Sequence, residues 1–444
     1  MCKKIKKNKR NCLKRLYSIS KSINFVITSK TNLVLMKKIY SIKDFGNSNG
    51  VDIRTQSHNF QKFVDQTNSF GHKSYWVMAT SGVGASMDIE EEKIPVSAFI
   101  SNDYLGMSQT DETKRAGIDA LLKYGTGACA AQAIGGYLDI HRQLEIAIAQ
   151  FTGQEDAILF SSGFGANTGL LRAILGKNDI AYIDSFIHTS AISGLRGTTV
   201  KHIGHNDIAY LDMILSADKG KYTTSVVIID GVYSQDGDLS LLPDYISVCR
   251  KHNCLLIMDD AHGIGVMGDH GRGTAEYYDC LGNVDIITGT CSKSFGCVGG
   301  FVAASREIIQ YLRYYADSNV FSAAMTPQVA GSVLKAIELI KNQPEIRNKL
   351  WDNVNYLRCK LKEKNFDIGE SVTPIFPIMV RDNQKVYAIA EELRKRNVFA
   401  SGIVYPAVRT KEARIRISVL ATHEKWQLDH LVNSLVEIRD IISF

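Results

Sequence analysis

Short apolar runs alternate with longer amphipathic stretches between about residues 99 and 301, and this alternation constrains the fold more than any other feature of the sequence. Apolar runs of strand length that are separated by helix-like segments, here residues 167–176 and 242–253, are typical of buried parallel strands in βαβ units. We therefore expect an α/β domain with a mostly parallel sheet. Its strands are predicted at residues 156–160, 180–184, 225–230, 254–260 and 284–290.

The pattern changes after about Thr326. Amphipathic helices are predicted at residues 330–342 and 385–397, and the runs at 375–380 and 413–420 alternate apolar with polar residues, as in a small antiparallel sheet packed by helices. A chain of 444 residues is long enough for roughly two or three domains. We therefore predict three parts after residue 43, namely an N-terminal segment at 44–97, a large domain at 98–325 and a smaller C-terminal α+β domain at 326–444.

Residues 1–43 form a basic leader. They contain 13 Lys or Arg and no acid, so the remainder, with 39 basic and 46 acidic residues, is mildly acidic and indicates no nucleic-acid-binding face. The apolar stretch from Ile23 to Met36 is too short and too polar to span a bilayer. The leader could be an organelle transit peptide, or could make weak contact with an anionic membrane surface. We favour a disordered tail. Translation from a start codon upstream of Met36, which itself resembles a natural beginning, would explain such a tail.

The cysteines indicate a reducing environment. All 9 are scattered, without a CxxC pair or a His and Cys cluster at metal-binding spacing. Several, such as Cys254, lie in apolar runs. We therefore expect buried thiols in a cytoplasmic protein, and no structural metal.

Lys293 directly follows the strand predicted at residues 284–290. Its neighbours Ser292 and Ser294, together with nearby glycines, are small enough for the backbone to approach a bound ligand closely. By itself the position fits an ordinary surface lysine equally well. The residues that follow the other predicted strands are the ones that favour a role for Lys293 in ligand binding.

Asp259, Asp260 and His262 end the strand predicted at residues 254–260. Open parallel sheets bind ligands at the carboxyl ends of their strands, so these side chains are candidate site residues. The glycines at 263, 265 and 268 match the dinucleotide-binding fingerprint, but they follow polar residues rather than the strand itself, and no apolar helix pattern comes after them. We therefore do not predict nicotinamide binding.

The segment SSGFGANTGLLRAIL predicts a tight turn into a helix whose first backbone N–H groups, near Gly163 and Phe164, are free. Free N–H groups and the helix dipole favour a phosphate at such an end, although a simple capped helix has the same sequence pattern. Thr290, three residues before Lys293, offers a hydroxyl that could reach the same phosphate.

Taken together, these segments resemble the α-oxoamine synthase family of fold-type I pyridoxal phosphate (PLP) enzymes. The resemblance extends from about Asn102 to the C-terminus and keeps the order of the family's motifs. The matching motifs are NDYLG (102–106), YGTG (124–127), GFGAN (163–167), DSFIHTS (184–190), DGVYSQDGD (230–238), DDAHG (259–263), TCSK (290–293), YPAV (405–408) and ARIRIS (413–418).

The resemblance implies a PLP cofactor and a role for each matching residue. Lys293 would hold PLP as a Schiff base and later move the substrate α-proton, while Asp259 would keep the pyridine nitrogen protonated. His188 would stack on the ring and hold the geometry of the site. The remaining implied cofactor contacts are His262 near the ring hydroxyl, Ser234 close to it, and Gly163, Phe164 and Thr290 at the phosphate.

The resemblance also implies partners. Arg416 would clamp the carboxylate of the amino acid through two parallel hydrogen bonds, and Asn102 belongs to a motif at the substrate. Ser322 would reach a phosphate across a subunit interface, which implies a homodimer. Ala131 and Gln132 replace residues that the family usually has near the substrate, and Arg409 to Lys411 replace the usual Pro-x-Gly.

The implied reaction is a decarboxylative condensation of an amino acid with an acyl thioester, carried by coenzyme A or by acyl carrier protein, to give a 2-amino ketone. Residues 318–340 resemble family members that transfer a long acyl chain to serine, whereas Gly263 after His262 resembles those that join alanine to a pimeloyl thioester. We favour the former, followed by the latter, by glycine C-acetyl transfer and by 5-aminolevulinate synthesis.

Two alternatives from other classes are a non-catalytic regulatory subunit and a PLP transaminase. Regulatory partners in this family characteristically lack the lysine that Lys293 supplies here. The NDYLG, HTS and DDAHG motifs argue against a transaminase.

Overall fold

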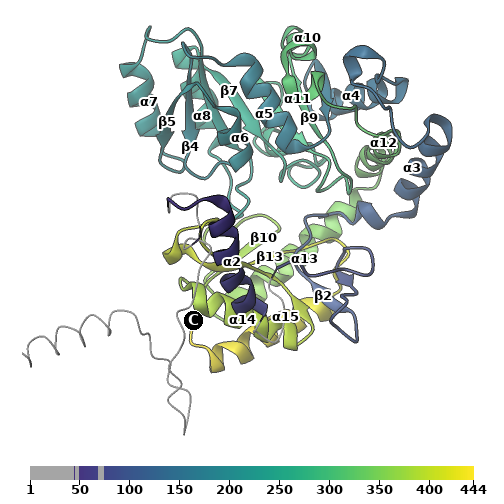
Figure 1. Cartoon of the computed structure of the whole chain (residues 1–444), viewed down its shortest axis with the longest axis vertical. Helices are drawn as coiled ribbons and strands as arrows, with labels where there is room; N and C mark the ends of the chain where they lie inside the picture. Colours follow the sequence, from purple (N-terminus) through teal and green to yellow (C-terminus); the bar gives the residue numbers. More distant parts are fainter. Residues whose placement is uncertain (1–44, 46–49, 69–74) are drawn as a thin grey trace, which may run out of the picture.

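The computed structural model describes residue 45, residues 50–68 and residues 75–444. Figure 1 shows two lobes, of which one holds a large sheet and the other holds two small sheets. The leader at residues 1–43 lies outside the described residues, so its expected disorder, transit role or membrane contact stays a prediction. In the described part of the chain, none of the helices combines the length and the apolar character that crossing a bilayer requires.

The large sheet consists of β3 (Asp156–Phe160), β4 (Ile180–Asp184), β5 (Thr199–Ile203), β6 (Ser225–Asp230), β7 (Leu255–Asp259), β8 (Ile286–Thr290) and β9 (Gly300–Ala304). Its strand order is β3-β9-β8-β7-β6-β4-β5. Pairing is parallel from β8 through β5, while β9 runs antiparallel to both β3 and β8. The predicted α/β fold with a mostly parallel sheet is confirmed.

Five of these strands coincide with predicted runs, within two residues at each end. The pattern predicts neither β5 nor β9. β5, of sequence TVKHI, lies at the edge of the sheet and is only partly buried, so it lacks the apolar run of a central strand. β9, of sequence GFVAA, is fully buried, but its small residues resemble a glycine-rich loop.

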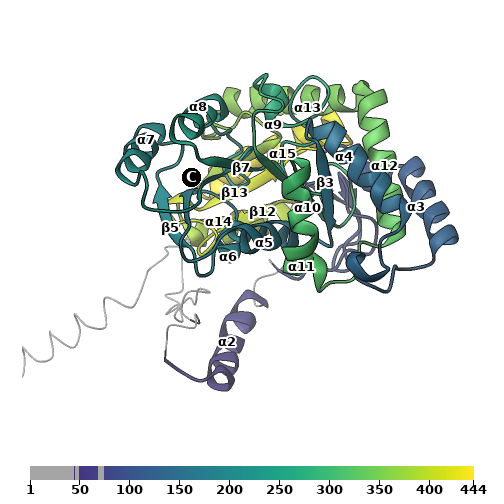
Figure 2. The ribbon, with the colours of Figure 1, turned by 90° about the horizontal axis from the view of Figure 1, so that it is seen from above.

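Helices cover both faces of the large sheet, as Figure 2 shows from above. Side chains such as Tyr182 point to the face covered by α7 (Ile208–Ala217) and α8 (Leu242–His252). The neighbouring Ile183 points to the opposite face. That face is covered by α5 (Gly163–Ile174), α6 (Thr189–Gly194) and α10 (Arg306–Tyr315). Because both faces are buried, the central strands are continuously apolar.

The second lobe contains an antiparallel sheet of β10 (Ile375–Met379), β13 (Arg414–Ser418) and β12 (Ser401–Ile403), in that order. The predicted antiparallel pairing near the C-terminus is confirmed. A further small sheet joins β1 (Ser86–Met87) and β2 (Val96–Ala98) to β11 (Val398–Phe399). Part of the N-terminal segment therefore pairs with the C-terminal region, while the predicted domain boundaries stay predictions.

The remaining helices complete the two lobes. α12 packs against α3 and α4, and it leads from the large sheet toward the second lobe. Proline at its first turn suits a helix start. The bounds are α2 (Ile53–Asn68), α3 (Asp111–Tyr124), α4 (Asp139–Thr152), α9 (Thr274–Tyr277), α11 (Asp317–Val320), α12 (Pro327–Asn342), α13 (Pro344–Glu363), α14 (Asn383–Lys395) and α15 (Lys425–Ile441), with short 3-10 turns at Met107–Gln109, Gln132–Ile134 and Thr410–Glu412.

Candidate active site

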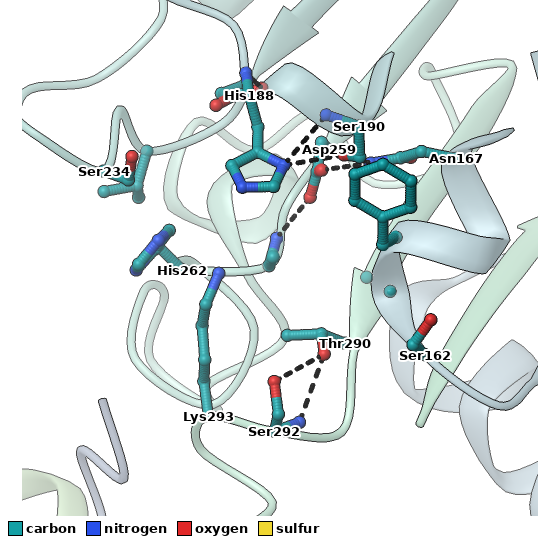
Figure 3. Close-up of a pocket in the computed structure, with 16 residues that line it drawn as sticks. Ser162, Asn167, His188, Ser190, Ser234, Asp259, His262, Thr290, Ser292 and Lys293 are labelled. Atoms are coloured by element: carbon teal, nitrogen blue, oxygen red, sulfur yellow. Dashed lines mark hydrogen bonds between the residues drawn. The ribbon is translucent and has the colours of Figure 1, made fainter. Parts of the chain in front are cut away.

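A cavity of about 290 Å³ lies at the carboxyl ends of β4, β6, β7 and β8, where open parallel sheets bind ligands (Figure 3). The predicted site residues that line it are Gly163, Phe164, His188, Ser234, Asp259, His262, Thr290 and Lys293. Three further predicted residues, Asn102, Ser322 and Arg416, do not line it.

Lys293 lies in the turn after β8, and its side chain extends into the cavity (Figure 3). Burial of its amine lowers the pKa from 10.5 to about 8, although the carboxylate of Asp259 acts in the opposite direction. The positive charge of Arg416 adds to the lowering. An amine with this pKa is partly neutral near physiological pH, as a nucleophile or proton carrier must be.

Asp259 is the last residue of β7 and faces the cavity. Its Oδ2 accepts a hydrogen bond from Asn167 Nδ2 at 2.6 Å, and its Oδ1 accepts one from the backbone N–H of Ala261 at 3.0 Å. Its register partner on β6 is Asp230. Burial raises the pKa of Asp230 well above 3.8, and the charge of Asp259 raises it further. Burial and the neighbouring carboxylate therefore favour the neutral form of Asp230.

His188 precedes α6 and caps its N-terminus. Its Nδ1 receives two hydrogen bonds from Ser190, one from the hydroxyl at 2.7 Å and one from the backbone N–H at 3.3 Å. The Ser190 hydroxyl accepts from Asn167 Nδ2 at 2.8 Å, which leaves its own proton for Nδ1. Burial lowers the pKa of His188. The ring is therefore neutral, with its proton on Nε2, the nitrogen directed toward the cavity in Figure 3.

His262 follows the acidic pair at the end of β7 and is almost fully buried. Its Nδ1 lies 2.8 Å from the hydroxyl of Tyr104. Burial lowers the pKa of His262 well below 6.5, and the charges of Lys293 and Arg416 lower it further. Burial raises the pKa of Tyr104 to about 12, so its hydroxyl stays protonated. Both groups are therefore neutral hydrogen-bonding partners.

α5 begins at Gly163 with its N-terminus at the cavity. The hydroxyl of Ser162 accepts from the Gly165 N–H at 3.0 Å. The N–H groups of Gly163 and Phe164 have no acceptor among the described residues, so they can bind an anion. A Cβ on Gly163 would lie 2.9 Å from the Cβ of Thr290, which is why glycine is needed there. This contact brings the α5 N-terminus next to the loop of Lys293.

Arg416, on β13, connects the second lobe to the loops around the cavity. Its Nε donates to the Ser234 carbonyl at 2.7 Å, and its Nη2 donates to Asn102 Oδ1 at 3.2 Å. Its Nη1 donates to the Ser418 hydroxyl at 2.7 Å. The structure therefore brings Arg416, Asn102 and Ser234 together beside the cavity, although they come from three distant parts of the sequence.

Ser322 lies just after α11, at the side of the site where α5 begins. Its hydroxyl is 3.4 Å from that of Ser161, and Ser161 precedes the cavity residue Ser162. Its expected contact across a subunit interface requires a second chain and stays a prediction.

Several residues of the site were not singled out from the sequence, although they lie within the quoted motifs. They are Tyr104, Asn167, Ser190 and Asp230. Asn167 and Asp259 are 92 positions apart, so their contact could not be read from local spacing. The sequence signal that could indicate such site residues is a polar residue placed where a strand ends or a helix begins.

The glycines that match a dinucleotide fingerprint lie in turns after β7. Gly265 and Gly268 both have φ of +82°, in the left-handed region that favours glycine. The next helix, α9, begins later at Thr274. The strand, turn and helix geometry of a dinucleotide site is therefore not formed by this segment.

The chemistry of the cavity fits one cofactor. A lysine amine of lowered pKa can form a Schiff base, a charged carboxylate can pair with a pyridine nitrogen, and free N–H groups at a helix N-terminus can hold a phosphate. These are the groups that PLP needs, and here they line one cavity. Fold and site together define a fold-type I PLP-dependent transferase.

Comparisons with known proteins agree. A family model described as aminotransferase class I and II matches residues 95–435. The chain is 38% identical over 380 residues to a serine palmitoyltransferase of Sphingobacterium spiritivorum, which covers 84% of this chain and 94% of the relative. It is also 38% identical over 337 residues to an 8-amino-7-oxononanoate synthase of Alkaliphilus metalliredigens, covering 75% and 85%.

A solved structure of a serine palmitoyltransferase with PLP superposes with a TM-score of 0.82 at 25% identity, and covers 88% of this chain and 99% of that one. The chain belongs to the α-oxoamine synthases, the PLP-dependent enzymes that transfer an acyl group to an amino acid.

Proposed function

We propose that this enzyme condenses serine, or a similarly small amino acid, with a long-chain acyl thioester and releases carbon dioxide and a 2-amino ketone. The observation that carries the proposal is that Lys293 and Asp259 face one cavity. There the amine must lose its charge to react, whereas the carboxylate must keep its charge to pair with a pyridine nitrogen. The amine has a lowered pKa, and the carboxylate of Asp259 lies beside Asp230, whose neutral form burial favours.

PLP, when bound, supplies an electron sink that stabilises negative charge on the α-carbon of the amino acid. Lys293 would hold the cofactor and, once its amine is free, would remove the α-proton and later return one. Asp259 would hold a proton on the pyridine nitrogen, and Asn167 orients its carboxylate. The free N–H groups of Gly163 and Phe164 would bind the phosphate.

Arg416 would bind the carboxylate of the amino acid. Its guanidinium is held by Ser234 and Asn102 beside the cavity, so its position is fixed before substrate arrives. Arginine suits this role because its planar group can donate two parallel hydrogen bonds to a carboxylate.

His188 would act as a hydrogen-bond donor through Nε2. Because Ser190 occupies Nδ1, the neutral ring offers a proton to the cavity rather than a free lone pair. Such a donor can polarise the carbonyl of an acyl thioester while it keeps its own proton. Lys293 then remains the base that moves the α-proton.

Similarity supports the long-chain assignment, and it also supports the alternative in which alanine is joined to a pimeloyl thioester. The serine palmitoyltransferase relative aligns over more of this chain than the 8-amino-7-oxononanoate synthase does, at the same identity of 38%. Gly263 is the residue that resembles the 8-amino-7-oxononanoate synthases, and it does not line the cavity. A Cβ there would lie 2.1 Å from Asp260 Oδ1, so packing accounts for this glycine without reference to substrate.

The experiment that tests the substrate assignment is a titration of the PLP-loaded protein with serine, alanine, glycine and cysteate while the cofactor absorbance is followed. Acyl thioesters of graded chain length are then added. We expect serine to shift the absorbance and long-chain thioesters to give product. A shift with alanine but not with serine would replace this assignment by 8-amino-7-oxononanoate synthesis, and a shift with glycine alone would favour glycine C-acetyl transfer.

We also propose that the enzyme is a homodimer. Phe321 and Ile134 are 88% and 80% exposed, and they lie on neighbouring segments joined by the hydrogen bond from the Ala324 N–H to the Ala130 carbonyl. Tyr314 on α10 is 72% exposed. Large apolar side chains gathered this way favour an interface with a second copy. Phe321→Asp should shift the mass in solution from dimer to monomer, and an unchanged mass would contradict the proposal.

A further inference from the structure

His205 follows β5, the edge strand of the large sheet, and binds two carboxylates that belong to different loops. Its Nδ1 lies 3.1 Å from Asp184 Oδ1, and its Nε2 lies 2.6 Å from Asp238 Oδ2. Asp184 ends β4 and precedes the loop that carries His188. Asp238 ends the loop that carries Ser234. His205 therefore links these two loops of the site directly.

The Asp184 end of this link is firmly fixed. Its side chain is fully buried and also accepts hydrogen bonds from the Phe186 N–H at 2.8 Å and from the Tyr245 hydroxyl at 3.1 Å. The N–H of Asn206 donates to it at 2.9 Å. The loop toward His188 thus starts from a carboxylate whose position is set by several donors.

The Asp238 end lies in a loop that is held from the other side by the second lobe. Arg414 donates to the Gln235 carbonyl at 3.0 Å and pairs with Asp236. Asn206, next to His205, donates to the Leu239 carbonyl at 3.0 Å. On the side of β4, His205 and Asn206 therefore hold the loop that carries Ser234 through hydrogen bonds.

Aromatic rings enclose the imidazole of His205. Phe186 stacks on it with ring centroids 4.4 Å apart and an angle of 16°, and Tyr233 meets it edge-on at 4.4 Å. Burial by itself would lower the pKa of His205, but the hydrogen bonds and charges of Asp184 and Asp238 raise it to about 9. The ring is therefore a cation at neutral pH, and it offsets part of the negative charge of the two carboxylates between which it lies.

We propose that His205 is a positioning residue, an imidazolium brace that holds the loop of His188 and the loop of Ser234 at a fixed separation across the cavity. The proposal rests on the proposed function for the roles of His188 and Ser234. The brace itself rests on the contacts of His205 with Asp184 and Asp238. Without the cation, the carboxylates of Asp184 and Asp238 would face each other between the two loops, and the loops would separate.

The test of the brace is hydrogen–deuterium exchange on the full-length protein, with and without PLP. His205→Gln keeps a side chain of similar length but removes the cation. We expect amide exchange to rise about 10- to 100-fold in both 185–190 and 232–239, the range for loss of a hydrogen bond to a charged group. Should this variant fail to fold, Asp238→Asn removes the charge from the more accessible end and should raise exchange in the same two segments.

His252→Gln is the matched control. His252 lies at the end of α8 and also binds an aspartate, with its Nε2 2.6 Å from Asp212 Oδ1, but it does not line the cavity. Its variant should leave exchange in both loops unchanged. Exchange that rises throughout the chain in His205→Gln, or only in the turn around residue 205, would overturn the brace.

A second readout separates positioning from general stability. In His205→Gln, PLP affinity and kcat should fall by about tenfold or more even at a temperature at which the PLP-free variant is still fully folded, because the two loops line the cavity. The double variant with Asp238→Asn should be no worse than the worse single variant. Equal losses of PLP affinity and of unfolding free energy would contradict a positioning role. If loop exchange responds as expected but the wild-type enzyme transfers no acyl group, the brace stands and the proposed function fails.

Discussion

Asp230 and Asp259 stand in register at the carboxyl ends of two adjacent parallel strands, yet their hydrogen-bonding surroundings differ. Burial raises the pKa of Asp230 well above its ordinary value, with the charge of Asp259 as the second cause. Asp259 accepts hydrogen bonds from Asn167 and from the Ala261 N–H. The pair thus places the carboxylate of Asp259 at the cavity beside an acid whose neutral form burial favours.

This difference predicts unequal effects of two similar substitutions. Asp259→Asn removes the charge that would keep the pyridine nitrogen protonated, and we expect kcat to fall by about 100-fold or more, as for loss of a preorganised electrostatic contact. Burial favours the neutral form of Asp230, which a neutral amide resembles, so Asp230→Asn should lower kcat by less than about tenfold. Steady-state kinetics on both variants measures this, and an equal loss in both would show that the assignment of charge is wrong.

The lowered pKa of Lys293 predicts how PLP-free protein captures the cofactor. The amine must be neutral to react, and its neutral fraction rises with pH until the pH passes its pKa of about 8. The rate of PLP capture, followed by absorbance, should therefore rise up to about pH 8 and then level off. Free N-acetyl-lysine serves as the control, and its rate should continue to rise to about pH 10.4.

Asp259→Asn changes this profile in a defined direction. The carboxylate of Asp259 stabilises the protonated amine and so raises the pKa of Lys293. Its removal should move the midpoint of PLP capture to lower pH. A midpoint that stays in place, or that moves to higher pH, would mean that the two groups do not interact across the cavity.

Arg416 and Arg414 allow a paired test of carboxylate binding on one strand. Arg416→Lys keeps the charge but loses the planar fork, so KM for the amino acid should rise about 10- to 100-fold. Arg414 is bound to Gln235 and Asp236. Arg414→Lys should therefore raise this KM by less than Arg416→Lys does, because Arg414 holds the Ser234 loop and makes no contact of its own with the cavity. Similar effects of both substitutions on KM would indicate that β13 positions the loop without binding substrate.

The hydrogen bonds of His188 predict its tautomer. Because Ser190 donates to Nδ1 from its hydroxyl and its backbone, nitrogen NMR should show the proton on Nε2 and a neutral ring at pH 7. In Ser190→Ala, which removes the 2.7 Å contact, some of the ring should change to the other tautomer. A proton on Nδ1 in the wild-type protein would exclude His188 as a donor to the cavity.

Local sequence patterns predict the central strands well, because a strand buried on both faces is a continuous apolar run. They do not predict β5, whose edge position leaves it polar, or β9, whose antiparallel insertion between β3 and β8 depends on pairing far along the chain. β1, β2 and β11 are too short to leave a pattern. Strand order is set by contacts between distant segments, and no local window contains them.

The same distinction applies to the site. Lys293, Asp259 and His188 lie in short motifs, and the order of these motifs along the chain makes them recognisable. The contacts that orient them cannot be recognised in this way, because Asn167 reaches both Asp259 and Ser190, and Arg416 reaches Ser234 across 182 positions. His205 carries no recognisable pattern of its own, and its role emerges from the two carboxylates that the fold brings to it.

Borohydride reduction of the PLP-loaded enzyme, followed by mass spectrometry of its peptides, tests the central claim most directly. The account predicts that a reduced pyridoxyl group is found on Lys293, and that Lys293→Ala binds PLP without any reducible linkage and loses acyl transfer. A pyridoxyl group on another lysine of the wild-type protein, or undiminished turnover by Lys293→Ala, would contradict it.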